Sequence, residues 1–199
     1  VDRPGAAHSL LLAGCVAPPR DKRDELAVGL MNRLLGGAFT SRINLNLREE
    51  KSWTYGARTA LAEARGPRPF WVSASVQADK TAAAIREVDR ELRGPLGPRP
   101  FSDAEVAAAV RAETLRLAGA WETVGSVADA LVHLSRAGLP DDAYQTLPAR
   151  LQALTREPVN AAAARVVRPE RAVWLVVGDR ARLEPELRAL AQELGLGPL

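Results

Sequence analysis

The sequence contains very little cysteine and histidine, which limits the crosslinks and metal sites that it can form. Its 199 residues include one cysteine, Cys15, and two histidines, His8 and His133. A single thiol excludes an internal disulfide, and it leaves both the bacterial cytoplasm and the periplasm open as compartments. Because the two histidines are far apart in the sequence, they do not form a ligand pair on one helical turn. We therefore expect this chain to bind no metal and no cofactor of its own.

Long apolar runs and clusters of basic and aromatic residues are also absent. No run of about 18 apolar residues occurs, so we expect no transmembrane helix. There is no basic segment followed by an apolar one of the kind found in signal peptides. The net charge is only +3 and aromatic residues make up 5% of the chain, which argues against a nucleic-acid-binding surface.

The composition is that of a compact domain, with 47% hydrophobic residues, enough to bury a sizeable core. The chain shows no internal repeat, and the loop at residues 94–100 is too short to separate two domains. We therefore expect one domain over residues 1–199. The opening Val-Asp-Arg-Pro is typical of a linker and indicates that this domain is part of a longer chain.

The hydrophobic periodicity predicts an α+β fold. Apolar or alternating runs predict strands at residues 9–16, 55–64, 70–78 and 172–177. Helices are predicted at residues 23–35, 40–50, 81–92, 102–118, 121–137, 141–154, 157–167 and 183–194. Ser102 and Glu105 have the spacing of a capping box at the start of one of these helices. We expect one mixed, mostly antiparallel sheet with the helices packed on one face.

Residues 34–56 contain the densest group of local signals. Gly36 and Gly37 directly follow an apolar-periodic helix, and they predict its end with residues free to adopt a positive φ. Thr40 or Ser41 can then cap the next helix.

The order and spacing of these residues resemble the non-zinc-binding homology domain of the insulinase/pitrilysin family of zinc metallopeptidases, which includes mitochondrial processing peptidase. The family pattern is N-x-x-L-G-G-x-F-x-S-R-L, followed by L-R-E and then by Tyr-Gly. The matching residues here are Asn32, Leu35, Gly36, Gly37, Phe39, Ser41, Arg42, Leu47, Arg48, Glu49, Tyr55 and Gly56. The segments 3–14 and 154–179 resemble the opening strand and the closing unit of the same domain, so the resemblance extends over nearly the whole chain.

The zinc-binding motif of that family is missing. Its peptidases hold zinc through an H-x-x-E-H helix motif and a distant Glu, and the first long helix is where such a motif would lie. The candidate positions in this chain are Ala27, Val28, Leu30, Met31 and Asn32, and none of them is a zinc ligand. The resemblance therefore implies a non-catalytic half. It also implies a catalytic partner domain that binds the zinc, in the same chain or in a separate subunit, and an unfolded peptide as substrate.

The resemblance assigns the substrate contacts to Arg48 and Tyr55. In the family, this pair projects toward the partner's active site, where it can donate hydrogen bonds to the scissile carbonyl or the neighbouring backbone. Without the motif, the residues alone favour a simpler arrangement, in which Arg48 pairs with Glu49 or Glu50 and Tyr55 is a half-buried strand residue. Further candidates for lining the cavity are Gly36, Gly37, Phe39 and Arg42, although the two glycines are also explained as a helix stop.

Two functions follow from the resemblance. In the first, the domain is the substrate-binding half of a zinc-dependent peptidase, closes the chamber and holds the peptide as an added strand on a sheet edge. In the second, it is a purely structural relative without proteolysis, of the kind found among the core subunits of respiratory complexes. The presence of Arg48 and Tyr55 favours the first function.

Overall fold

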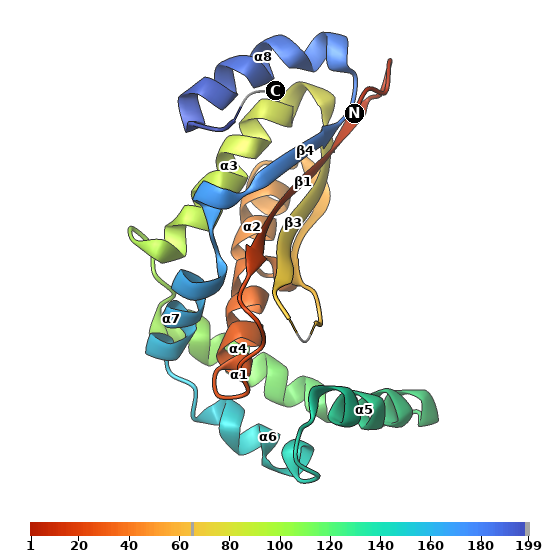
Figure 1. Cartoon of the computed structure of the whole chain (residues 1–199), viewed down its shortest axis with the longest axis vertical. Helices are drawn as coiled ribbons and strands as arrows, with labels where there is room; N and C mark the ends of the chain where they lie inside the picture. Colours follow the sequence, from red (N-terminus) through yellow and green to blue (C-terminus); the bar gives the residue numbers. More distant parts are fainter. Residues whose placement is uncertain (65, 198–199) are drawn as a thin grey trace.

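The structure, a computed structural model, describes residues 1–64 and 66–197 (Figure 1). The four strands of these residues form one sheet, and they are β1 (His8–Ala17), β2 (Thr54–Leu61), β3 (Arg68–Gln77) and β4 (Val173–Val177). Their order is β2-β3-β1-β4, and each neighbouring pair is antiparallel. A parallel bridge between Asp2 and Gly178 adds to the edge at β4. The predicted α+β fold with a mostly antiparallel sheet is confirmed.

Helical segments connect and follow the strands. The α-helices are α1 (Glu25–Asn32), α2 (Arg42–Asn44), α3 (Thr81–Arg93), α4 (Asp103–Leu117), α5 (Val124–Ala137), α6 (Ala143–Gln152), α7 (Arg156–Val166) and α8 (Arg180–Leu194). The π-helical turns η1 (Arg33–Gly37) and η2 (Leu45–Glu50) extend α1 and α2. The short 3₁₀ turns are η3 (Ala78–Lys80), η4 (Gly94–Leu96) and η5 (Pro169–Arg171). In Figure 1, α5 and α6 lie at the opposite end of the molecule from α8.

The sheet has one covered face and one open face. Along β1, Leu11 and Ala13 are buried whereas Leu10 and Val16 are exposed. Successive side chains of a strand point to opposite faces, so this alternation means that helices cover one face only. The covered face belongs to one buried apolar cluster that includes residues of α1, α3 and α7. The open face carries apolar side chains in contact with solvent.

The polypeptide between α4 and α5 differs from the prediction. A helix was expected to begin at residue 121, but α4 ends at Leu117 and α5 begins at Val124. Thr123 is extended, with φ −123° and ψ 151°, and it forms a capping box with Ser126. This cap starts a new helix, because its side chains satisfy backbone N–H groups that have no partner within the helix. The predicted box of Ser102 and Glu105 is confirmed at the start of α4.

The first helix ends at Gly37, as predicted, but not in the expected conformation. Gly36 and Gly37 are the last two residues of η1, and Ala38 after them is extended. Among the described residues, the glycines with a positive φ are Gly5, Gly138 and Gly195. The expectation that Gly36 and Gly37 adopt a positive φ is therefore wrong. Their small size serves a different purpose, because both lie in close contact with neighbouring residues.

Candidate functional site

The start of β2 is irregular, and this irregularity exposes Tyr55. The pairing of β2 with β3 shifts register between Thr54 and Ala57. The Thr54 hydroxyl donates to Ser75 O at 2.6 Å and accepts from the Gly56 N–H at 3.0 Å, which holds the chain in this shape. Bulges re-aim side chains away from the regular strand positions. Tyr55 is 95% exposed, so the alternative of a half-buried strand tyrosine does not apply.

A left-handed residue joins the helix of Arg48 to β2. Ser52 has φ 55°, unusual for a residue other than glycine. The Ser52 N–H donates to Arg48 O at 3.1 Å, and the Trp53 N–H donates to Leu47 O at 3.0 Å. These are the hydrogen bonds of a helix end closed by a left-handed residue. The sharp reversal brings Arg48, in the last turn of η2, close to the same surface as Tyr55.

Arg48 is held by two neighbours. Its guanidinium carbon lies 3.8 Å from the centroid of the Phe39 ring, a distance at which the ring face attracts a cation. Its Nη1 also donates to Glu49 Oε1 at 2.6 Å. The simpler pairing with Glu49 is therefore present, but it occurs together with the stacking on Phe39. The Arg48 side chain remains 30% exposed, so part of the donor fork can reach a ligand.

Two adjoining hollows surround Tyr55. The first, here called the Phe39 hollow, has a volume of ≈ 460 Å³. It is lined by Leu10, Gly36, Gly37, Ala38, Phe39, Asn44, Tyr55, Gly56, Ala57, Arg58, Ser73, Ala74 and Ser75. The second, here called the Arg48 hollow, has a volume of ≈ 350 Å³ and is lined by His8, Arg48, Glu49, Ser52, Trp53, Thr54, Tyr55, Ser75 and Gln77. Five of the six predicted site residues therefore line one hollow or the other, and Tyr55 lines both.

The sequence did not single out Asn44, which connects three parts of the site. Its Nδ2 donates to Ala38 O at 3.0 Å and to Ser41 Oγ at 3.2 Å, while its Oδ1 accepts from the Ala57 N–H at 2.8 Å. Asn44 is only 6% exposed. It thus fixes the segment that carries Phe39 against the start of β2.

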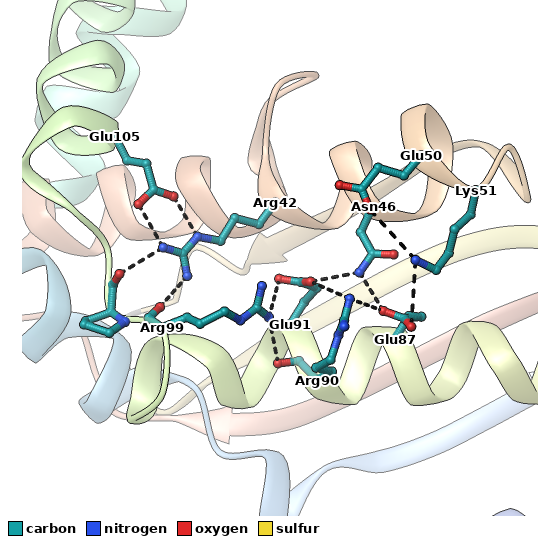
Figure 2. Close-up of polar contacts among 10 residues, drawn as sticks. Arg42, Asn46, Glu50, Lys51, Glu87, Arg90, Glu91, Arg99 and Glu105 are labelled. Carbon is teal, nitrogen blue, oxygen red and sulfur yellow. Dashed lines mark hydrogen bonds and ion pairs between the residues drawn. The ribbon is translucent and has the colours of Figure 1, made fainter.

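Arg42 lies outside both hollows. Its guanidinium donates to both carboxylate oxygens of Glu105, at 2.8 and 2.9 Å, and to the carbonyl oxygens of Arg99 and Pro100 (Figure 2). Burial alone would raise the pKa of Glu105, but the hydrogen bonds from Arg42 and Ser102 outweigh it and lower this pKa to about 2. With its donors engaged in this way, Arg42 joins α2 to the start of α4.

A second polar group fixes η2, the turn that carries Arg48, on α3. Glu91 is 3% exposed and accepts from Asn46 Nδ2 at 2.8 Å and from Arg99 Nη2 at 3.0 Å (Figure 2). Asn46 Nδ2 also donates to Glu87 at 2.7 Å. A buried carboxylate is tolerated when charged and polar donors surround it. The network anchors the helix beneath Arg48 and leaves Arg48 itself at the surface.

The described residues do not form a zinc site. No group of three or more His, Cys, Asp or Glu side chains that could hold a metal ion occurs among them. His8 is on β1 and borders the Arg48 hollow, whereas His133 is on α5 with its Nδ1 3.5 Å from Glu63. The two imidazoles thus lie on different elements, and the residues present do not fit the tetrahedral zinc site of a metallopeptidase.

The chain belongs to the M16 peptidase family, as its inactive domain. The family model "Peptidase M16 inactive domain" matches residues 2–113, which include both hollows and the strands β1, β2 and β3. Comparison with curated protein sequences gives no match. No helix of the described part of the chain has the length and apolar character needed to cross a membrane. The resemblance inferred from the sequence is confirmed.

Solved structures share this fold. The peptidase M16 inactive domain from Pseudomonas fluorescens matches with a TM-score of 0.79 and 23% identity, over 90% of this chain and 42% of that chain. The inactive peptidase domain of a candidate zinc protease from Bordetella parapertussis matches with a TM-score of 0.70 and 18% identity, over 88% of this chain and 94% of that chain. A chain of complex III from Candida albicans matches with a TM-score of 0.68 and 13% identity, over 94% of this chain and 48% of that chain.

These identities establish the fold alone. This chain spans less than half of the Pseudomonas and Candida chains that it matches.

Proposed function

We propose that this domain is the substrate-binding, non-catalytic half of a zinc-dependent peptidase. Arg48 and Tyr55 would supply hydrogen-bond donors to the backbone of a peptide held between the domain and its catalytic partner. The observation that carries this proposal is the geometry around Tyr55. A bulge exposes this side chain almost fully, and Arg48 borders the same hollow while stacked on Phe39.

The chemistry of the two side chains suits a carbonyl oxygen. Arg48 presents a rigid fork of N–H donors, and Tyr55 presents a phenolic O–H. Among the described residues, the Tyr55 hydroxyl makes no hydrogen bond with another protein group. Stacking on Phe39 and pairing with Glu49 reduce the rotational freedom of Arg48, so less entropy is lost when it binds a ligand. Such donors stabilise the negative charge that develops on a carbonyl oxygen during peptide cleavage.

The substrate would be an unfolded peptide lying in the two hollows. The edge of β2 is already engaged at two points, because Asn44 accepts from the Ala57 N–H and Gly36 packs against Thr59. A peptide strand added along all of β2 would have to displace these contacts. We therefore place the peptide over Tyr55 and the open face of the sheet, where Leu10 is exposed.

The zinc and the catalytic residues would belong to a partner half. This partner would be an M16 domain with the H-x-x-E-H motif, either on the same polypeptide or in a separate subunit. Support comes from the family itself, since the matching model describes an inactive domain. The short span relative to solved chains is a further argument, because it leaves room for a second domain.

The test is reconstitution with the catalytic partner that the same or a neighbouring gene encodes. Arg48→Ala and Tyr55→Phe should each lower kcat with folding intact, by about 10²–10³ or less, the range known for single oxyanion-type donors. Tyr144→Phe is the matched control, because the Tyr144 hydroxyl donates to Ala130 O within the helical end of the molecule. Circular dichroism should be the same for all variants.

The alternative is a purely structural subunit without proteolysis. The similarity to a chain of complex III over 94% of this sequence motivates it, although at 13% identity this similarity concerns the fold alone. An unchanged kcat in both Arg48→Ala and Tyr55→Phe, or the absence of any H-x-x-E-H partner, would favour this alternative.

A further inference from the structure

The first three residues already lie along the outer edge of β4. The Val1 amino group donates to Val176 O at 2.8 Å, and the Gly178 N–H donates to Val1 O at 3.1 Å. The Arg3 N–H then donates to Gly178 O at 2.7 Å. Gly5 turns the chain with φ 73° and donates to Asp179 at 2.9 Å. The chain then enters β1 on the other side of β4.

These hydrogen bonds have the register of a parallel ladder. In such a ladder, one residue donates to the residue before its partner and accepts from the residue after it. Val1 follows this rule with Val177 as its partner, since it bonds to Val176 and Gly178. Extended backwards, the ladder places the second residue before Val1 opposite Leu175. Its N–H would reach Trp174 O, and its carbonyl oxygen would accept from the Val176 N–H.

A groove lies where this extension would run. Its volume is ≈ 650 Å³, and it is lined by residues 173–176 of β4, by Val1 and by α8. The helices contribute Ile85, Leu187 and Leu190 to its wall. Trp174 also lines the groove, and its indole Nε1 is buried without a hydrogen-bond partner among the described residues. In the described part of the chain, the groove thus combines an unpaired strand edge with an apolar wall.

We propose that the residues preceding Val1 in the longer chain form a fifth strand, parallel to β4, that fills this groove. The inference rests on the proposal that the domain is part of a longer chain. It identifies the segment that joins this domain to the preceding one as part of the sheet. The linker to the preceding domain would then be rigid where it enters this domain, since each added backbone hydrogen bond fixes the linker to β4.

The register also predicts the chemistry of this strand. Val1 lies beside Val177, and alternate side chains point to opposite faces. The first and third residues before Val1 would lie beside Val176 and Trp174, which pack against the core. These two residues should therefore be apolar. The second and fourth residues would make the backbone hydrogen bonds and turn their side chains to the open face.

The test compares amide hydrogen exchange in this 199-residue chain and in the natural polypeptide that includes the preceding residues. The Trp174 and Val176 amides should exchange about tenfold or more slowly in the longer polypeptide. A proline at the second position before Val1 removes the donor to Trp174 O and should reverse much of this protection. The matched control is a proline at the first position, whose N–H points away from β4 in this register.

Three results would overturn the inference. The first is equal exchange of both amides in the two polypeptides, and the second is equal loss of protection in the two proline variants. The third is a gene in which no residues precede Val1. Protection that depends on protein concentration would instead assign the groove to a second copy of the chain. Peptide turnover by the reconstituted peptidase is a separate readout, so failure of this inference and failure of the proposed function can be distinguished.

Discussion

Gly36 lies so close to Thr59 that a side chain at this position would collide with strand β2. A β-carbon on Gly36 would be 2.7 Å from the Thr59 amide nitrogen and 2.6 Å from its Cγ2. The Thr59 hydroxyl also donates to Asn32 O at 3.2 Å. The end of the first helix is therefore pressed against the backbone of β2, next to the Phe39 hollow. Glycine is needed for this approach and not for an unusual φ.

Gly36→Ala should destabilise the domain by about 1–3 kcal/mol, the usual cost of overpacking, because the added methyl group meets backbone that cannot move aside. Gly29→Ala is the matched control, since Gly29 is in α1 and its β-carbon would have no neighbour within 4 Å. That change should stabilise the domain by roughly 0.5–1 kcal/mol through helix propensity. Urea unfolding measures both changes. Equal effects of the two substitutions would contradict the prediction.

Ser52→Gly should raise the free energy of unfolding. Ser52 has φ 55°, and the left-handed conformation costs an L-residue roughly 1–2 kcal/mol. Glycine adopts it without this cost, although it gains entropy in the unfolded chain, so we expect a net gain of about 1 kcal/mol or less. Ser52→Ala keeps the strained conformation and serves as the control. Thermal unfolding measures the relative stability of the two variants. A glycine variant no more stable than the alanine variant would refute the prediction.

Glu105 should make the free energy of unfolding depend on pH in the acidic range. Its folded-state pKa is lowered to about 2 from the ordinary value of 4.5, so its ion pair with Arg42 stabilises the fold fully above the unfolded-state pKa. This contribution is lost as the pH falls through the window from 4.5 to about 2. Glu105→Gln should therefore lower stability at neutral pH and flatten its dependence in this window.

The control for this pH dependence is Glu122→Gln, because Glu122 is exposed and forms no ion pair within the described ranges. Chemical unfolding at several pH values gives both curves. A Glu105→Gln curve parallel to that of the wild type would show that the ion pair does not stabilise the fold in this way.

Phe39 should act as a positioning residue for Arg48. Phe39 is 64% exposed and its ring lies under the Arg48 guanidinium, a contact worth about 0.5–1 kcal/mol at exposed sites. In the reconstituted peptidase, Phe39→Leu should lower kcat/KM by roughly two- to fivefold, the factor that corresponds to this energy. The same substitution should have little further effect in an Arg48→Ala background, because coupled residues are not additive. Additive effects of the two substitutions would contradict a positioning role.

Much of the fold could be predicted from local patterns. The strands and helices follow the apolar periodicity, and the capping box of Ser102 and Glu105 occurs as expected. These features depend on interactions between residues a few positions apart, which the spacing in the sequence predicts. The start of α5 was placed three residues too early, at residue 121, because the capping box of Thr123 and Ser126 was not recognised in the sequence.

The candidate site was predicted only in part. Its residues came from a motif, but the motif did not indicate that Arg42 pairs with Glu105 in place of lining a hollow. Nor did it indicate that Asn44 connects the Phe39 segment to β2. These contacts join residues that become neighbours only when α2 packs against α4 and β2.

The sequence by itself determined that this chain has only two histidines, far apart, that it contains both strands and helices, and that Arg48 and Tyr55 have the spacing of the motif from which the site was predicted. Residue identity and short-range spacing are sufficient for each of these conclusions. Only the tertiary structure decided that a register shift exposes Tyr55, that Arg48 stacks on Phe39, and that residues 1–3 pair with β4. These features depend on backbone geometry and on contacts between distant segments, which arise when the sheet and its helices pack together.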